Sequence, residues 1–375
     1  MPALLPNVDP QGLEEFSVVF TDRSLNHMSQ QFQGVMRDIS QMLKEVYNAD
    51  AVALVPGGGT CAMEAAARQF ASGKKALVVR NGWFSFRWSQ IFDMGGFAGD
   101  VTVAMARQAG NGAQSPFAPA PIEDVVAQIR SVRPDVVFAP HVETAAGLIL
   151  PDDYLKALAD AAHEVGALFV LDCIASGCVW VDMKAVGVDV LISAPQKGWS
   201  ASPSAGLVMF SESAEKRLEA TTSNSFALDL KKWRAIMAAY EGGGYAYHLT
   251  MPTDALRAFR DTMVETREYG FAKLRAAQLQ LGQAVRAELA ARGVKSVAAD
   301  GFGAPGVVVS YTEDPDIQNG KKFLAKGVQI AAGVPLQVGE GPEFRTFRLG
   351  LFGLDKLYDV DATVARVKAA LDAAL

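Results

Sequence analysis

A lysine stands where an apolar segment passes into a polar turn, in DVLISAPQKGWSASPSAG at 189–206. Lys197 follows an apolar run of strand length, so we expect it at the carboxyl end of a parallel strand. Such a lysine can be a solvated side chain on a loop. It can also form a Schiff base with a carbonyl compound, which requires a confined amine that is unprotonated near neutral pH. Lys197 is therefore a candidate catalytic residue.

An aspartate ends the apolar run that precedes this segment, LFVLD at 168–172. A carboxylate at the end of an apolar strand is costly unless it meets a partner. Asp172 could cap the next helix or close a turn. Alternatively, it could pair with the ring nitrogen of pyridoxal phosphate and keep that nitrogen protonated, so that the ring accepts electrons. Because α/β sheets bind ligands at the carboxyl ends of their strands, we expect Asp172 and Lys197 to lie together.

A third candidate is the turn in VPGGGTCAMEAAARQF at 55–70, where glycines and a threonine open a predicted helix directly after a strand. Amides at a helix N-terminus, approached closely at glycine, form an anion site that suits a phosphate. Glycines also serve ordinary turns between strands and helices. Neither GxGxxG nor the GKS and GKT sequences of nucleotide-binding loops occurs here.

The elements that must position these residues follow from the hydrophobic pattern. The predicted strands are 51–55, 76–79, 101–105, 135–140, 168–172, 189–193 and 206–210. The predicted helices include 29–47, 60–72, 121–132 and 151–165. Alternation of this kind is typical of β-α units on a mostly parallel sheet, so we predict an α/β fold.

The pattern changes in the last third of the chain. Residues 222–250 indicate an irregular connection, and 252–293 indicate one long helix that ends at Gly293. The segments 294–299, 306–311 and 344–353 are predicted strands, followed by a final helix near 358–374. We therefore expect an N-terminal arm, a large domain and a small C-terminal domain, at residues 1–20, 21–252 and 253–375.

Composition and charge exclude several classes of protein. Half of the 375 residues are hydrophobic, and the formal net charge of −6 does not suit nucleic acid. The three cysteines and the lack of a leader or a long apolar span predict a cytoplasmic protein that does not enter a membrane. The four histidines form no metal-binding motif, so we expect no metal.

The order of these features, with S-x-x-Q-K-x-x-x-x-x-P-x-x-G at 193–206, resembles the class V aminotransferase family of fold-type I pyridoxal phosphate enzymes. The resemblance is closest to the alanine-glyoxylate and serine-glyoxylate aminotransferase group, and it runs from about residue 26 to residue 353. It implies a seven-stranded type of sheet in the large domain. It also implies that Lys197 forms the Schiff base with the cofactor and that Asp172 pairs with the pyridine nitrogen.

Further residues can be carried over from the family one position at a time. The turn GGGTCAMEAA is similar to the family's phosphate-binding turn, which implies that Gly58, Gly59 and Thr60 lie against the cofactor phosphate. Gln196 is similar to a residue that also reaches this phosphate.

In RNGWFSFR, Phe84 best matches the aromatic residue that stacks on the pyridine ring, and Trp83 is the alternative in the adjacent register. The segment YAYHLT resembles a motif that is offered across the dimer interface to the neighbouring subunit's phosphate. This implies roles for Tyr247 and Thr250 and an obligate homodimer.

The segment TFRLGLFG is similar to the family's segment that binds the substrate's α-carboxylate through an arginine, which is Arg348 here. A guanidinium matches a carboxylate with two hydrogen bonds.

The chain also departs from the family. Its N-terminal segment FSVVFTDRSLNHMSQQF replaces a PGP-type stretch that lines the substrate pocket, where Asn26 and His27 could take similar space. Alanines 145 and 146 replace hydroxyl residues, so any hydrogen bond that those hydroxyls make is missing or replaced.

Two polar residues follow the strand at 135–140. His141 and Glu143 are expected at the same sheet edge, where each could be structural or could approach the cofactor. No cysteine follows Cys178, whereas the cysteine desulfurase branch of the family needs a late nucleophilic cysteine.

The resulting hypothesis is a homodimeric transaminase that moves an amino group from a small amino acid, of the serine or alanine type, to glyoxylate or pyruvate. The nearest alternative is an enzyme of the same fold with another donor or reaction, such as a 2-aminoethylphosphonate-pyruvate transaminase, a lyase or an epimerase. A dinucleotide-binding oxidoreductase and a catalytically silent binding protein are the other two alternatives.

Overall fold

The computed structural model describes residues 8–375, and a seven-stranded sheet is its largest feature. The strand order is β1-β11-β10-β9-β6-β2-β3. The strands are β1 (Ala51–Pro56), β2 (Ala76–Arg80), β3 (Val101–Met105), β6 (Val136–Pro140), β9 (Leu168–Asp172), β10 (Val190–Ser193) and β11 (Ala205–Phe210). Strand β11 is antiparallel to both of its neighbours, and every other pair is parallel. The predicted α/β fold with a mainly parallel sheet is confirmed.

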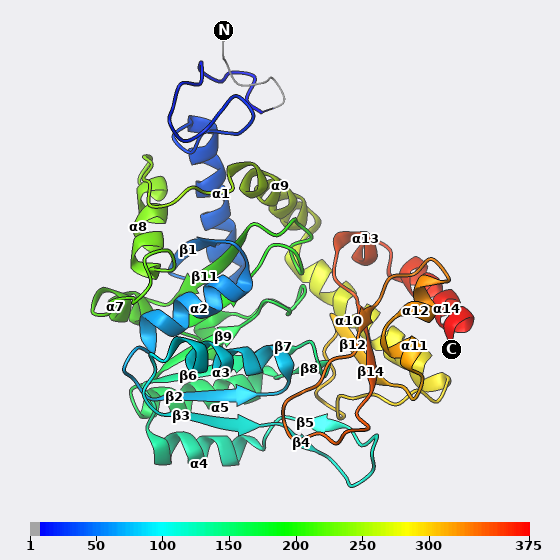
Figure 1. The fold of residues 1–375 in the computed structure, drawn as a ribbon. Helices are drawn as coiled ribbons and strands as arrows, with labels where there is room; N and C mark the ends of the chain where they lie inside the picture. Colours follow the sequence, from blue (N-terminus) through cyan, green and yellow to red (C-terminus); the bar gives the residue numbers. More distant parts are fainter. Residues whose placement is uncertain (1–7) are drawn as a thin grey trace.

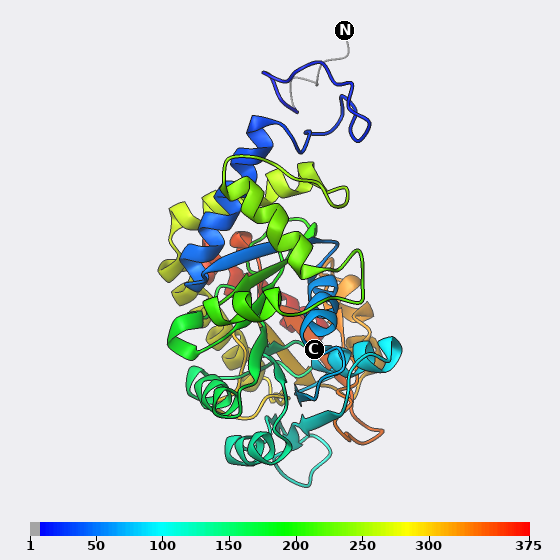
Figure 2. The same ribbon diagram turned by 90° about the vertical axis from the view of Figure 1, so that its left-hand side faces the viewer.

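Helices cover both faces of this sheet (Figure 1). They are α1 (Gln30–Tyr47), α2 (Gly59–Phe70), α3 (Trp83–Gly95), α4 (Ile122–Val132), α5 (Asp152–Glu164), α6 (Met183–Val186), α7 (Glu212–Glu219) and α8 (Leu230–Glu241). Helices α2 and α3 lie together on one face of the sheet, and α4 and α5 lie together on the other. The turned view shows the sheet between these layers, with the chain before α1 projecting beyond them (Figure 2).

The last third of the chain forms a second, smaller sheet with its own helices. Strands β12 (Val307–Tyr311), β14 (Thr346–Gly350) and β13 (Ala331–Ala332) are antiparallel neighbours in that order. The helices are α9 (Thr253–Tyr269), α10 (Phe271–Ala291), α11 (Pro315–Gln318), α12 (Lys321–Leu324), α13 (Leu354–Leu357) and α14 (Val360–Ala374). Two short hairpins complete the fold, β4 (Arg107–Gln108) with β5 (Phe117–Ala118) and β7 (Val142–Glu143) with β8 (Leu148–Ile149).

Three predictions about elements were wrong. The helix expected over 252–293 is two helices, because Gly270 has φ of 105° and interrupts the helical conformation between α9 and α10. The connection expected over 222–250 contains α8, which Asp229 caps by accepting hydrogen bonds from two backbone amides. Residues 294–299 form no strand and make only isolated bridges.

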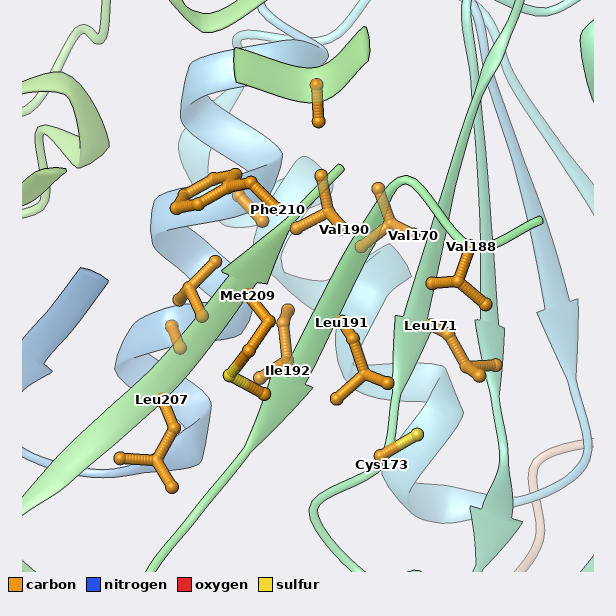
Figure 3. Close-up of a cluster of buried hydrophobic side chains, with 14 of the residues drawn as sticks. Val170, Leu171, Cys173, Val188, Val190, Leu191, Ile192, Leu207, Met209 and Phe210 are labelled. Carbon is orange, nitrogen blue, oxygen red and sulfur yellow. The ribbon is translucent and has the colours of Figure 1, made fainter. Parts of the chain in front are cut away.

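The core of the large sheet explains how the candidate residues are held. Strands β9, β10 and β11 are buried along their whole length, and Figure 3 shows their Leu, Val, Ile and Met side chains filling the space beside the sheet. Such strands place the residues that follow them rigidly at the sheet edge. No helix of residues 8–375 is long and apolar enough to cross a membrane.

Candidate active site

One cavity at the carboxyl edge of the large sheet contains most of the candidate residues. Its volume is about 170 Å³. Its lining comes from the ends of the strands β1, β2, β6, β9 and β10 and from the segments that follow them, including the starts of α2 and α3: Gly59, Thr60, Met63, Phe84, Arg87, Val142, Thr144, Asp172, Ile174, Ala175, Gln196 and Lys197. A hollow of about 610 Å³ elsewhere, lined by Lys295, Glu313 and Arg345 among others, contains none of the predicted site residues.

The start of α2 contributes to the lining of this cavity. Gly57 has φ of 119°, a conformation that favours glycine, and Gly58 is the N-cap of α2. A Cβ at Gly59 would lie 2.4 Å from Cδ1 of Ile174, whereas a Cβ at Gly58 would meet no atom within 4 Å. Glycine at 59 therefore lets α2 approach the turn after β9, and open space remains in front of the helix N-terminus.

Asp172 ends β9 and is buried, with 7% of its surface exposed. Its carboxylate Oδ1 accepts a hydrogen bond from the Ile174 amide at 2.9 Å. Burial raises the pKa of Asp172 to about 7, and the nearby Glu143 carboxylate adds to this shift, while Arg87 and Lys197 act against it. A carboxylate in this position is stabilised by a cation that enters the cavity.

Lys197 lies four residues beyond the end of β10, beside Gln196. Burial lowers the pKa of Lys197, and the positive charge of Arg348 lowers it further. Its Nζ lies 5.2 Å from the ring centre of Phe352. Burial and the Arg348 charge therefore both favour the unprotonated amine that a nucleophilic lysine requires.

Phe84, rather than Trp83, faces the cavity. The Trp83 ring packs against Phe86 instead, with 6.0 Å between ring centres. Glu143 fixes the start of α3, because its carboxylate accepts hydrogen bonds from the Phe84 amide at 3.2 Å and from the Ser85 amide at 2.9 Å. The Ser85 hydroxyl and the Ala145 amide donate to the same carboxylate. Glu143 is a buried cap and does not line the cavity.

Arg348 lies on β14 and reaches toward the cavity from the smaller sheet. Its Cζ is 5.5 Å from the ring centre of Phe84, and its Nε donates to the Ala332 carbonyl at 2.8 Å. Burial lowers the pKa of Arg348, and the Glu143 charge opposes this shift. No carboxylate of residues 8–375 forms an ion pair with this guanidinium, which is therefore free to bind an anion.

Tyr247 and Thr250 do not line the cavity of their own chain. The Tyr247 hydroxyl lies 3.0 Å from the Thr250 hydroxyl, and the Tyr247 side chain is 53% exposed. His27 packs against the Tyr247 ring, and Asn26 is hydrogen-bonded to Glu15, so neither takes the place of the pocket-lining stretch in the same chain.

Two polar residues of the cavity lining, Arg87 and Thr144, were not predicted from the sequence. Arg87 faces the cavity because it lies three residues after Phe84 on α3, a spacing that could have revealed it. Thr144 supplies a hydroxyl-bearing side chain at the cavity, while Ala145 and Ala146 are fully buried in an apolar cluster beside it. His141 is also buried, with Nδ1 2.7 Å from the Ser176 hydroxyl, and burial lowers the pKa of His141 to about 3.

The chemistry of the cavity fits pyridoxal phosphate. The space before the α2 N-terminus suits its phosphate, the buried Asp172 carboxylate suits a protonated ring nitrogen, and the amine of Lys197 suits its aldehyde. Residues 8–375 contain no cluster of three or more His, Cys, Asp or Glu side chains that could bind a metal ion. Fold and site thus define the class of fold-type I pyridoxal phosphate enzymes.

Comparison with known families and structures agrees with this class. The aminotransferase class-V family matches residues 13–334, so the chain belongs to that family, and pyridoxal phosphate is its cofactor. Arg348 lies beyond the matched residues. The solved structure of an alanine-glyoxylate aminotransferase from Nostoc sp. superposes with a TM-score of 0.77 and 22% identity, covering 92% of this chain and 88% of the other.

Three proteins of similar sequence have different names. A soluble hydrogenase small subunit from Synechococcus sp. is 26% identical over 92% of this chain and 87% of its own. An alanine-glyoxylate aminotransferase from Felis catus is 28% identical over 66% of this chain and 58% of its own. A 2-aminoethylphosphonate-pyruvate transaminase from Paraburkholderia phymatum is 28% identical over 92% of this chain and 89% of its own. The protein is accordingly a pyridoxal phosphate-dependent transaminase of class V.

Proposed function

We propose that the protein transfers the amino group of a small amino acid, of the serine or alanine type, to glyoxylate or pyruvate. The observation that carries this proposal is the convergence of Lys197, Asp172 and the α2 N-terminus on one cavity, with the unpaired guanidinium of Arg348 beside it. The name of the Felis catus relative supports a glyoxylate acceptor.

Each residue has a defined task in this proposal. Bound pyridoxal phosphate supplies an electron-accepting ring that stabilises negative charge at the α-carbon of the amino acid. Lys197 provides the amine that holds the cofactor and then moves a proton at that α-carbon, a role favoured by its lowered pKa. Asp172 holds the ring nitrogen protonated, Phe84 covers one face of the ring, and Arg348 orients the substrate carboxylate.

The phosphate would be bound by Gly58, Gly59, Thr60 and Gln196 of one subunit and by Tyr247 and Thr250 of its partner. We propose a homodimer because these last two residues are exposed and lie away from the cavity of their own chain. Two large apolar side chains, Phe16 and Phe226, are each 74% exposed, which suits an interface where a second subunit covers them.

We further propose that the large domain comprises residues 21–252 and the small domain residues 253–375.

A second candidate is the transfer of an amino group from 2-aminoethylphosphonate to pyruvate, which the Paraburkholderia phymatum relative favours by its name. A phosphonate would compete for the same Arg348 guanidinium, which binds either anion.

Product analysis separates these candidates. Purified holoenzyme is incubated with L-serine, L-alanine, L-aspartate or 2-aminoethylphosphonate, each with glyoxylate or with pyruvate, and the new amino acid is quantified. Glycine formed from glyoxylate with serine or alanine supports the proposal. Turnover only with 2-aminoethylphosphonate establishes the second candidate, and release of ammonia without a new amino acid points to a lyase.

A further inference from the structure

A second arginine faces the cavity from α3. Arg87 lies three residues after Phe84, on the same side of the helix, and both side chains line the cavity. The guanidinium Nη1 donates a hydrogen bond to the Thr60 hydroxyl at 3.0 Å, and its Cζ lies 4.7 Å from the Phe84 ring centre. These two contacts hold the guanidinium beside the first turn of α2.

The charge of Arg87 has no counter-ion in the part of the chain that the structure describes. No carboxylate among residues 8–375 lies within ion-pair distance of it, whereas Arg68 on the neighbouring α2 pairs with Glu64 at 2.6 Å. The charge nevertheless acts in the cavity, because it lowers the pKa of both Asp172 and Lys197. A cation at this position without a carboxylate partner suits a bound anion.

Arg87 lines the cavity and Arg348 lies beside it, and the two arginines have different partners. Arg348 contacts the carbonyls of Ala332 and Thr144, on the side of the smaller sheet. Arg87 contacts Thr60 on α2, whose N-terminus is the proposed phosphate site. Two anionic groups therefore have separate partners: the substrate carboxylate at Arg348 and the cofactor phosphate near Arg87.

We propose that Arg87 is a further cofactor-binding residue that pairs with the phosphate of pyridoxal phosphate. The α2 N-terminus carries only a fraction of a positive charge, so a phosphate dianion gains from a full cation at its side. Thr60 positions the guanidinium, and Phe84 covers its face. This inference rests on the proposed assignment of the cavity as the cofactor site.

Binding of two forms of the cofactor to the apoenzyme tests the inference. Pyridoxal lacks the phosphate but keeps the ring and the aldehyde, so a phosphate contact affects only pyridoxal 5′-phosphate. Dissociation constants of both are measured by absorbance and protein fluorescence for the wild type, Arg87→Gln, Arg87→Lys and Thr60→Val. Arg130→Gln is the matched control, because Arg130 pairs with Glu164 on the far face of the sheet.

Arg87→Gln is expected to weaken pyridoxal 5′-phosphate binding by about 10- to 100-fold and to leave pyridoxal binding within about twofold. Arg87→Lys keeps the charge and should lose less, while the Arg130→Gln control should lose nothing. Salt should weaken pyridoxal 5′-phosphate binding more in the wild type than in Arg87→Gln. Thr60→Val removes a residue already assigned to the phosphate, so it is a positive control with a loss confined to the phosphorylated form. If Arg87→Gln does not fold, Arg87→Lys supplies the second test, because it loses the guanidinium fork and should still bind only the phosphorylated form more weakly.

Equal losses for both forms would assign Arg87 a structural role and overturn the inference. Unchanged cofactor binding with a higher KM for the amino donor would make Arg87 a substrate residue, which also overturns it. A wild-type protein that binds neither form would instead refute the assignment of the cavity, so the two failures are distinguishable.

Discussion

At the scale of single residues, the site is dominated by charged groups that form no ion pair with any of residues 8–375. Asp172 is buried with a raised pKa, whereas Lys197 and Arg348 are half-buried cations whose pKa values burial lowers. Each shift disfavours the charged form in the apoenzyme. A ligand that supplies the opposite charges is therefore favoured at this site. A cationic ring nitrogen suits Asp172, and anionic groups suit the two basic side chains.

The raised pKa of Asp172 predicts how the stability of the apoenzyme depends on pH. The folded value is about 7 and the ordinary value is 3.8, so the folded state binds the proton more tightly than the unfolded state. The stabilisation is complete below about pH 3.8 and is lost as pH rises toward 7. Relative to Asp172→Asn, the wild-type apoenzyme should therefore lose thermal stability over this range.

The measurement is the Tm of both apoproteins across this pH range, repeated with saturating pyridoxal phosphate. The cofactor should flatten the wild-type slope, because a protonated ring nitrogen compensates the Asp172 carboxylate. Parallel pH profiles for wild type and Asp172→Asn would contradict the prediction.

Arg348 gives a prediction about substrate binding. Arg348→Gln should raise the KM for the amino donor by about 10- to 100-fold, because a charge-assisted contact to the carboxylate is lost. Cofactor affinity should change by no more than about twofold. Steady-state kinetics and cofactor titration measure the two effects, with Arg345→Gln as the control on a half-buried neighbouring arginine that does not line the cavity. Equal losses of donor and cofactor binding would indicate a structural role.

At the scale of elements, prediction from sequence succeeded where the signal is local. The strands that end near Asp172 and Lys197 are short apolar runs, and the structure places both residues at the same sheet edge. The helix interruption at Gly270 was missed because a single glycine is tolerated inside many helices, and the sequence alone does not reveal that this glycine adopts φ of 105°.

The roles of Glu143 and Arg348 could not be predicted from local sequence patterns, because both depend on long-range contacts. Glu143 caps α3 across 58 or 59 residues of sequence separation, because three of its four hydrogen bonds come from Phe84 and Ser85. Arg348 reaches the cavity from the smaller sheet, 204 residues from its partner Thr144. Neither contact has a sequence pattern of its own, so the resemblance to a family suggested Arg348, and nothing distinguished a cap from a catalytic carboxylate at Glu143.

Because Glu143 caps the start of α3, we expect it to affect cofactor binding only by holding Phe84 in position. Glu143→Ala leaves buried amides at the start of α3 without an acceptor, so the free energy of unfolding should fall by about 2 to 4 kcal/mol. Glu143→Gln keeps an acceptor oxygen and should lose less. Urea unfolding measures the stability, and cofactor titration reports whether Phe84 is displaced. Wild-type stability in Glu143→Ala would show that the cap contributes nothing.

At the scale of the whole molecule, one chain does not complete the proposed site. Tyr247 and Thr250 lie outside the cavity that they are proposed to serve. Two residues of the cavity lining are accessible to solvent, because Thr60 is exposed and Arg87 is half-buried, which leaves room for a second subunit to contribute these hydroxyls.

Subunit complementation tests this arrangement. Lys197→Ala and the double variant Tyr247→Phe/Thr250→Val should each be inactive or strongly impaired as homodimers. Mixed dimers, formed by co-expression, contain one site with its own Lys197 and with Tyr247 and Thr250 from the partner. With random pairing, about a quarter of wild-type activity should return. Activity no higher than the sum of the two separate variants would refute the shared site.

The most direct test of the central claim is the visible absorption spectrum of the purified protein, recorded before and after addition of an amino donor. The wild type should carry a yellow cofactor band that one small amino acid bleaches and an oxo acid restores. Lys197→Ala should remain folded and lose this donor response. A wild-type protein that stays colourless after incubation with pyridoxal phosphate, or a Lys197→Ala variant that cycles like the wild type, would contradict the account.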